Sequence, residues 1–328
     1  MDDGIYFGNG AAVQRFEQDM NLRFGDCKPR DATHVLGLTV SQRPGEVHIS
    51  MPSTIDKMVE RFLPGTRQTA HVPINAHEPI DLLDCHTEGE EPTYPYREAA
   101  GSVIWASVTC RPDIAYAIGQ LTRVQARPGK KHWAQLKQLL CYLRDTKNHG
   151  ITYRRTGNKE PRAYVDASFA DTPGRIHPGA DPNGRKSTGG HVIELAGGAV
   201  SYSSSGQPVA ALSTTESELI EAVRATRDII FVRKLLFTME RACTTPTVLL
   251  EDNNPVIKLM EDAITAANKR SRHIELRWFW LREAITNGIV ELVKVASADN
   301  VADIMTKGLY KPTFTGLRDK LVAPPPSV

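Results

Sequence analysis

The stretch from residue 151 to the C-terminus alternates short apolar runs and helical periodicity in an order that few folds can accommodate. Runs at 162–169, 188–195 and 199–205 predict three successive strands, and a long helix is predicted over 213–240. The remaining predicted elements are a strand at 246–252, helices at 255–263 and 272–288, a strand at 289–296 and a helix at 299–309. The resulting order, β-β-β-α-β-α-α-β-α, is typical of the α/β (α+β) class.

The part of the chain before residue 151 is organised differently. Over residues 1–63, short strands are predicted to alternate with helices: strands at 5–8, 34–41 and 47–50, and helices at 12–24 and 52–62. Residues 64–95 form an acidic, loop-like stretch, and residues 96–155 have helical periodicity, with Pro112 and Pro128 marking helix starts. With a domain over 156–322 and a disordered tail at 323–328, these segments make up the predicted domain organisation.

Charge is unevenly distributed, although the formal net charge is only +2. Residues 97–160 carry 12 Lys and Arg against 4 Asp and Glu. Such a segment is typical of a surface that binds nucleic acid, and equally of helices that lysine and arginine keep soluble. The charge pattern alone leaves both interpretations open.

Targeting signals and cysteine usage indicate where the protein works. No apolar run approaches the roughly 18 residues of a membrane span, and no basic region followed by an apolar stretch opens the chain. The 5 cysteines are scattered, without a C-x-x-C pair. We therefore expect an intracellular protein, cytoplasmic or nuclear, with reduced thiols and no membrane partner.

Four acidic residues fall where predicted strands end or helices begin: Asp166, Glu218, Asp252 and Asp303. A carboxylate on an apolar strand costs free energy unless something compensates it, and a divalent cation is the usual compensation. If the four converge, they can hold two Mg²⁺ ions about 4 Å apart, with Mn²⁺ as a substitute. Such a pair of ions suits phosphodiester hydrolysis.

Each acid also has an ordinary structural interpretation. Glu218, like its neighbour Glu216, can belong to a solvated helix face. Asp252 can cap the next helix through an Asx turn, and Asp303 is a favourable acid near a helix N-terminus. The order of the four along the chain is more specific than any one of them.

The chain resembles the C-terminal part of a copia-type retrotransposon Pol polyprotein. The motifs that carry the resemblance to its ribonuclease H domain are YVDASFA, RKSTGGHV, ALSTTESEL, LLEDNN, RHIELRWFWLRE and NVADIMTKGL. The segment that begins YREAAGSVIWASV resembles the connection between polymerase and ribonuclease H. The opening MDDGIYFGNG resembles the end of the reverse-transcriptase palm, starting inside its Tyr-x-Asp-Asp hairpin.

The resemblance implies a ribonuclease H-like fold, a mixed five-stranded sheet flanked by helices, preceded by a partial palm over 1–63 and a helical connecting segment. It also implies hydrolysis of the RNA strand of an RNA–DNA hybrid by a two-metal mechanism. Asp166 would bridge both metals, with Glu218 and Asp252 on one side and Asp303 on the other. Glu218 is preferred to Glu216 because it directly precedes Leu219, which matches the family's Glu-(Tyr/Leu) step.

Further residues are candidates for contacts with nucleic acid: Arg185, Lys186, Ser187, Ser213, Thr214, Arg272 and His273. Their ordinary interpretations are a solvated turn, a helix cap and packing. The chain departs from the family pattern at Ser168, where a second acid is common, and it has no histidine just before the last helix. The stretch 202–208 also lacks the lysines often found there.

Two functional hypotheses follow. The first is a ribonuclease H that acts on RNA–DNA hybrids, and the alternative is a catalytically weak or inactive nucleic-acid-binding relic of a retroelement. Reverse transcription is not expected, because Asp2 and Asp3 would be vestigial members of a polymerase triad whose third acid, fingers and nucleotide-binding strands lie upstream. The implied partners are the hybrid, other nucleic acid along 97–160 and the missing polymerase half.

Overall fold

The computed structural model describes residues 5–6, 8–25, 31–78, 80, 84–85, 94–157, 159–169, 186–261 and 272–325, with the side chains of 272–275 left out. The strands are β1 His34–Val35, β2 Leu38–Arg43, β3 Glu46–Ser50, β4 Ile151–Arg154, β5 Arg162–Ser168, β6 Thr188–Leu195, β7 Gly198–Gly206, β8 Thr247–Glu251 and β9 Val290–Lys294. The helices are α1 Gly10–Phe24, α2 Pro52–Phe62, α3 Tyr96–Thr109, η2 Pro112–Ile114, α4 Ala115–Thr122, α5 Lys130–Asp145, α6 Thr214–Thr238, α7 Asn254–Glu261, α8 Arg272–Thr286, η3 Ser297–Asp299, α9 Asp303–Thr306 and α10 Lys311–Leu321.

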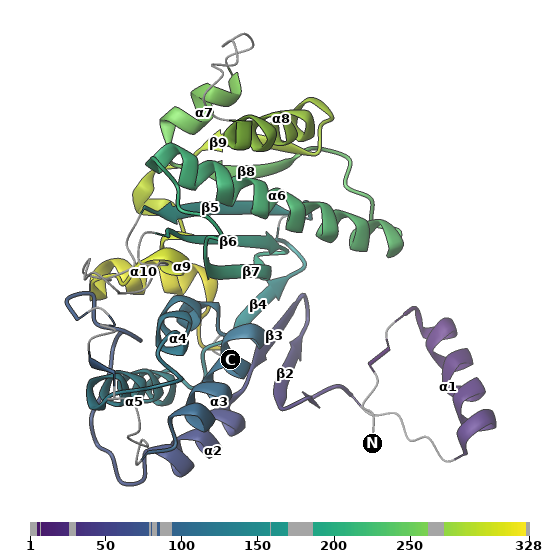
Figure 1. The fold of residues 1–328 in the computed structure, drawn as a ribbon. Coiled ribbons are helices and arrows are strands. Elements are labelled where there is room, and N and C mark those ends of the chain that lie inside the picture. Colours follow the sequence, from purple (N-terminus) through teal and green to yellow (C-terminus); the bar gives the residue numbers. More distant parts are fainter. Residues whose placement is uncertain are drawn as a thin grey trace.

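A mixed five-stranded sheet forms the centre of the C-terminal half, in the order β7-β6-β5-β8-β9 (Figure 1). Strands β5, β6 and β7 are antiparallel neighbours, whereas β8 runs parallel to β5, and β9 parallel to β8. This is the ribonuclease H-like sheet that the family resemblance implies, and the predicted fold class is confirmed.

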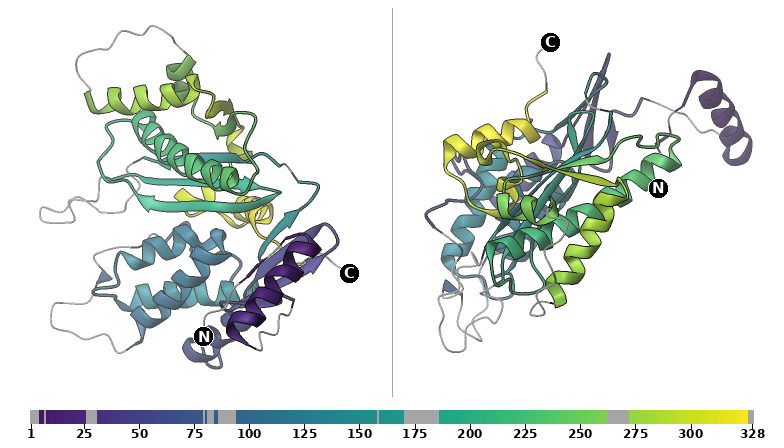
Figure 2. Two further views of the ribbon diagram at one scale, coloured as in Figure 1. Left: turned by 90° about the vertical axis from the view of Figure 1, so that its right-hand side faces the viewer. Right: turned by 90° about the horizontal axis from the view of Figure 1, so that it is seen from above.

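Helices cover both faces of this sheet, as two adjacent glycines of β6 demonstrate. Successive residues of a strand point to opposite faces. A Cβ at Gly189 would meet the Glu221 carboxylate of α6, whereas one at Gly190 would meet Met305 and Thr306 of α9. Figure 2 shows α6 and α8 on one side of the sheet, and α9 with the helices of the connecting segment on the other.

A second sheet has four antiparallel strands in the order β1-β2-β3-β4. Its last strand, β4, follows the helical segment and pairs with β3, with Ile151 opposite Ile49. The preceding Gly150 permits this approach, because a Cβ there would lie 2.0 Å from the Ile49 carbonyl oxygen. The sequence pattern did not predict β4 as a strand, since its partner lies about a hundred residues earlier in the chain.

The hydrophobic core has two parts. One lies between the sheet and α6 and α8, and contains Val165, Ile193 and Leu219. The other joins the helices of the connecting segment to the opposite face of the sheet, through Leu139, Val192 and other buried residues. The connecting helices therefore share a core with the five-stranded sheet.

Two predictions about secondary structure are wrong. The described residues within 5–8 are not in a strand; Tyr6 instead packs on Phe16, with ring centroids 4.8 Å apart, and α1 stands away from the other elements in Figure 1. The predicted helix over 299–309 is divided, because the Asn300 amide donates to the Val165 carbonyl oxygen at 2.9 Å and breaks the helical ladder. The short helix α9 follows, and then α10, which was not predicted.

No helix among the described residues has both the length and the apolarity needed to cross a membrane.

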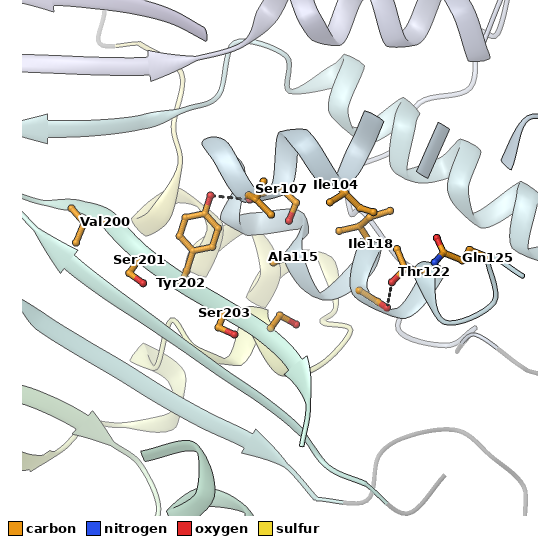
Figure 3. A pocket seen from close by; sticks show the side chains of 13 residues that line it. Ile104, Ser107, Ala115, Ile118, Thr122, Gln125, Val200, Ser201, Tyr202 and Ser203 are labelled. Carbon is orange, nitrogen blue, oxygen red and sulfur yellow. Dashed lines mark hydrogen bonds between the residues drawn. The ribbon is translucent and has the colours of Figure 1, made fainter. Parts of the chain in front are cut away.

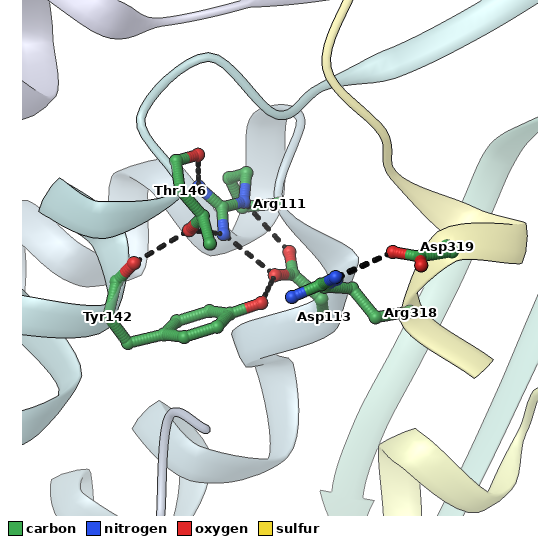
Figure 4. A network of polar contacts seen from close by, with 6 residues as sticks. All are labelled: Arg111, Asp113, Tyr142, Thr146, Arg318 and Asp319. Carbon is green, nitrogen blue, oxygen red and sulfur yellow. Dashed lines mark hydrogen bonds and ion pairs between the residues drawn. The ribbon is translucent and has the colours of Figure 1, made fainter. Parts of the chain in front are cut away.

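A buried ion pair fixes the turn between α3 and α4 (Figure 4). The Arg111 guanidinium donates to both carboxylate oxygens of Asp113, at 2.9 and 2.7 Å, and neither side chain is exposed. Tyr142 of α5 donates to Asp113 at 2.6 Å, and Arg111 also donates to Thr146 just beyond α5. The pair therefore ties this turn to α5.

The neighbouring His149 makes stability depend on pH. Burial, together with the positive charges of Arg111 and Arg318, lowers the pKa of His149 to about 4. Between pH 4 and 6.5 the unfolded chain then binds more protons than the folded one, so the free energy of unfolding falls as the pH drops through this window. Because the ring is only half buried, we expect His149 to account for about 1–2 kcal/mol of the loss.

Chemical denaturation at pH 7 and pH 4.5 measures how the free energy of unfolding depends on pH. We expect the pH dependence to shrink in His149→Gln and to persist in the control His71→Gln, whose side chain is exposed. An unchanged pH dependence in His149→Gln would assign the effect to other groups.

Candidate active site

Two parallel strands bring the first pair of predicted acids together. Tyr164 of β5 lies opposite Leu250 of β8. Two residues further along the chain are Asp166, within β5, and Asp252, directly after the end of β8. Because parallel strands end at the same edge of a sheet, both carboxylates reach that edge. The pairing of β5 with β8 therefore fixes where the two carboxylates lie relative to each other.

The first turns of α6 place Glu216 and Glu218, the two glutamates considered as candidate ligands, in different environments. Ser213 is the N-cap residue, and its hydroxyl accepts the backbone N–H of Glu216 at 3.1 Å. The Glu216 carboxylate accepts the backbone N–H of Leu212 at 2.7 Å, so this acid caps the helix. Glu218, two residues later, is buried and turned toward the aspartates instead.

The last acid is positioned by α9, which packs on β5 and β6. Asp303 is the first residue of this helix, and Thr306 at its end donates a hydrogen bond to Asp166. Lys307 follows, with its ammonium 2.9 Å from the Asp303 carboxylate and 3.4 Å from that of Asp166. Ser168, which stands where the family commonly has a second acid, donates to the Thr306 carbonyl oxygen and so also anchors α9.

The structure thus brings all four predicted acids to one place. One carboxylate oxygen from each of Asp166, Asp252 and Asp303 lies within 4.8 Å of the others. The same holds for Glu218, Asp252 and a fifth acid, Glu251, at the end of β8. Asp252 belongs to both groups and joins them.

This concentration of negative charge perturbs the carboxyl groups. Burial, with Glu251 and Asp166 nearby, raises the pKa of Glu218 to about 11. Burial likewise raises the pKa of Glu251 to about 8 and that of Asp303 to about 6, in both cases helped by the charge of Asp166. The buried oxygens Glu218 Oε2 and Glu251 Oε2 accept no hydrogen bond from any described residue. Carboxylates in this state suit a divalent cation, which prefers oxygen ligands and would supply the missing positive charge.

Two residues of this cluster were missed by sequence reasoning. Glu251 had been treated only as part of a strand, although its place beside Asp252 in LLEDNN was a visible signal. Lys307 lies one turn after Asp303 in the motif NVADIMTKGL, which is the spacing of an i,i+4 ion pair.

The predicted nucleic-acid contacts fall in different environments. Ser213 and Thr214 are exposed at the start of α6, and Lys186 lies just before β6. Ser187 is fully buried, and its carbonyl oxygen accepts the backbone N–H of Gln207. Arg185, Asp2 and Asp3 lie outside the described residues, as do the side chains of Arg272 and His273.

A groove runs between the connecting helices and the edge strand β7. Its first part, about 600 Å³, has Ile104 of α3 and Ile118 of α4 facing Val200–Ser203 of β7 (Figure 3). A second part of about 460 Å³ shares Thr122 and Ser204 with the first and continues to Arg123 and Lys186.

The far end of this groove is tied to the first turns of α6. Gln207, which lines it, donates from its side-chain amide to the Ser217 carbonyl oxygen at 2.7 Å, one residue before Glu218. The groove is rich in hydroxyl groups, with Ser201, Ser203 and Ser204 on the strand side.

The close approach of α9 to β6 offers a test of how the site is held. At Gly190 a Cβ would lie 2.4 Å from the Met305 Cβ and 2.9 Å from the Thr306 Cγ2. Gly190→Ala should therefore push α9, with Asp303, away from the sheet and cost about 1–3 kcal/mol of stability. Thermal denaturation measures this. Gly206→Ala is the control, because a Cβ there meets nothing within 4 Å; equal melting temperatures for the two variants would contradict the prediction.

Comparison with known proteins identifies the family. A retrovirus-related Pol polyprotein from transposon TNT 1-94 of Nicotiana tabacum is 29% identical over 323 residues, which are 96% of this chain and 23% of that protein. The Pol polyprotein from transposon RE2 of Arabidopsis thaliana is 27% identical over the whole chain and 22% of its own length. The chain belongs to the Pol polyproteins of copia-type retrotransposons. It spans about a quarter of the length of these Pol relatives.

Part of the chain is similar to other proteins. Secreted RxLR effector protein 161 of Plasmopara viticola is 35% identical over 138 residues, which are 42% of this chain and 91% of that protein. No protein-family model matches this chain. Among solved structures, ribonuclease H1 of Halobacterium salinarum has a TM-score of 0.32 and 17% identity, covering 44% of this chain and 93% of its own. LC11-RNase H1 in complex with an RNA/DNA hybrid has a TM-score of 0.32 and 14% identity, covering 45% and 94%.

Proposed function

We propose that this copia-type chain is a ribonuclease H, which hydrolyses the RNA strand of RNA–DNA hybrids with two Mg²⁺ ions. The observation that carries the proposal is the convergence of Asp166, Glu218, Asp252 and Asp303 at one edge of a ribonuclease H-like sheet. Membership of the Pol family and likeness to LC11-RNase H1, a structure in complex with an RNA/DNA hybrid, agree with it.

The four acids would hold the ions, Asp166 between them, Glu218 and Asp252 on one side and Asp303 on the other. When bound, a pair of divalent cations activates water and stabilises the leaving oxygen in phosphodiester hydrolysis. The chain's own residues keep the ligands in place: Thr306 hydrogen-bonds Asp166, and Lys307 balances part of the charge of Asp166 and Asp303. This support restricts the motion of the carboxylates before any ion arrives.

The experiment is a cleavage assay on the purified chain with Mg²⁺ and a labelled RNA–DNA hybrid. We expect cuts in the RNA strand only, none in double-stranded RNA or DNA of the same sequence, and none in the presence of a chelator. Hybrid binding without cleavage would favour the alternative, a nucleic-acid-binding relic. Primer extension by the same chain would contradict the expectation that it lacks polymerase activity.

The groove beside β7 is the proposed path for the nucleic acid beyond the cleavage site. It lies partly on the basic segment 97–160, carries Arg123 and Lys186, and is lined by Gln207, which bonds the backbone of α6 at Ser217. Cationic side chains along such a path bind phosphates and release counterions. Arg123→Gln and Lys186→Gln should each weaken hybrid binding and reduce the salt-dependence slope of log Kd by about 1.

Fluorescence anisotropy at several salt concentrations measures that slope. Lys57→Gln is the control, because it removes the same charge from an exposed site on α2. If all three variants bind alike, the groove is not the path of the nucleic acid.

A further inference from the structure

The fifth acid of the cluster, Glu251, has no place in the proposed set of four. It is the last residue of β8 and is fully buried, although a buried glutamate costs free energy unless it is neutral or paired. Its carboxylate is aimed at the cluster, because one oxygen lies within 4.8 Å of ligand oxygens of Glu218 and Asp252.

Only one of the two carboxylate oxygens of Glu251 accepts a hydrogen bond from the described residues. Oε1 accepts the backbone N–H of Asn253 at 2.9 Å, which fixes the side chain in the turn before α7. Oε2 accepts no hydrogen bond from any described residue, and neither does the nearby Glu218 Oε2. Two buried carboxylate oxygens without hydrogen-bond partners in one cluster of acids are groups whose charge a cation would compensate.

Positive charge is placed unevenly around the cluster. Lys307 pairs with Asp166 and Asp303. Within the described part of the chain, no lysine, arginine or histidine forms an ion pair with Glu218 or Glu251. When all five acids are ionised, as they would be with cations bound, the five carboxylates and one ammonium carry four negative charges, which two divalent cations would balance.

We propose that Glu251 is a further ligand of the divalent cation held between Glu218 and Asp252. The inference rests on the proposed metal-dependent function, and it adds a carboxylate to that function's ligand set. An additional anionic oxygen strengthens binding of a hard cation, so this position should bind Mg²⁺ more tightly than Asp166, Glu218 and Asp252 would without Glu251. The backbone contact to Asn253 holds the ligand in place and limits the entropy lost on binding.

The test is calorimetric titration of the full chain with Mg²⁺, and with Ca²⁺ as a second probe, alongside thermal denaturation. Glu251→Gln keeps the size of the side chain and removes its charge. We expect it to weaken the affinity for Mg²⁺ at this position about 10-fold. We also expect it to raise the melting temperature without metal, since one buried charge is gone, and to shrink the increase that Mg²⁺ produces.

Glu291→Gln is the matched control, because Glu291 lies on the neighbouring strand β9 with an exposed side chain. Its titrations should match those of the unmodified chain. A purely structural Glu251 predicts the opposite pattern: a melting temperature lowered equally with and without Mg²⁺, and unchanged affinity. Either that pattern or absence of Mg²⁺ binding by the unmodified chain overturns the inference.

The binding measurements also separate this inference from the proposed function. If the chain cleaves no hybrid but Glu251→Gln still weakens Mg²⁺ binding, the ligand assignment stands and ribonuclease activity does not. If the chain cleaves hybrids and Glu251→Gln leaves both Mg²⁺ affinity and the Mg²⁺ dependence of cleavage unchanged, the ribonuclease activity stands and the assignment of Glu251 as a ligand fails.

Discussion

Replacing Asp252 with asparagine should reduce hybrid cleavage by about 10³-fold or more, the largest effect expected of any single substitution in this chain. Asp252 belongs to both groups of neighbouring carboxylates, and in the proposed ligand set it holds one cation with Glu218, so its loss should empty that position. Asparagine has nearly the same shape, and Asp252 is only partly buried, so the fold should be retained. Single-turnover cleavage of a labelled hybrid at saturating Mg²⁺ measures the loss.

A matched comparison within α6 tests whether the effect belongs to the cluster. Glu218→Gln should also suppress cleavage strongly, whereas Glu216→Gln should leave the cleavage rate within a few-fold of the unmodified chain, because Glu216 caps the helix. Thermal melts of all three variants would separate lost chemistry from lost structure. A Glu216 variant as inactive as the Glu218 variant would contradict the assignment of these two acids.

Breaking the buried ion pair of the connecting segment should have the largest effect on stability. Asp113→Asn leaves Arg111 fully buried beside an uncharged group, which we expect to cost about 3–5 kcal/mol of unfolding free energy. Asparagine also offers a single acceptor oxygen where Arg111 and Tyr142 now donate to two, so the contact between this turn and α5 weakens as well. Urea denaturation followed by circular dichroism measures the change.

The exposed pair Arg61–Glu98 is the control for this prediction. Both side chains are more than half exposed, and Glu98→Gln should cost less than about 1 kcal/mol. The double variant Arg111→Met with Asp113→Leu should recover part of the loss, because it leaves no unpaired charge in the core. An Asp113 variant as stable as the Glu98 variant would mean that the buried pair contributes nothing.

The acidic cluster was largely predictable because its members stand at strand ends and helix starts. Local sequence marked the strand that carries Asp166, the strand that ends before Asp252 and the N-cap of α6, and each of these elements formed as expected. The choice between Glu216 and Glu218 rested on the family resemblance; the structure adds that Glu216 is committed to the helix cap.

Other features depended on contacts that no local pattern encodes. The strand β4 exists because β3 is there to pair with it, and the expected strand at 5–8 is absent where the described residues offer it no partner. The division of the last predicted helix depends on Asn300, whose amide reaches a carbonyl of β5. At β4 and at Asn300 a long-range hydrogen bond outweighed the local preference, whereas at 5–8 the long-range partner that a strand needs is missing among the described residues.

The sequence alone determined the ribonuclease H-like order of elements, the copia-type family and the four acids, because periodicity, caps and motif spacing are local properties. Tertiary structure alone decided which carboxylates lie close to one another, where Lys307 pairs, and that Glu251 joins the cluster. The physical reason is that charge interactions depend on distance and burial across strands. Those quantities are set only when β5, β8, α6 and α9 pack together.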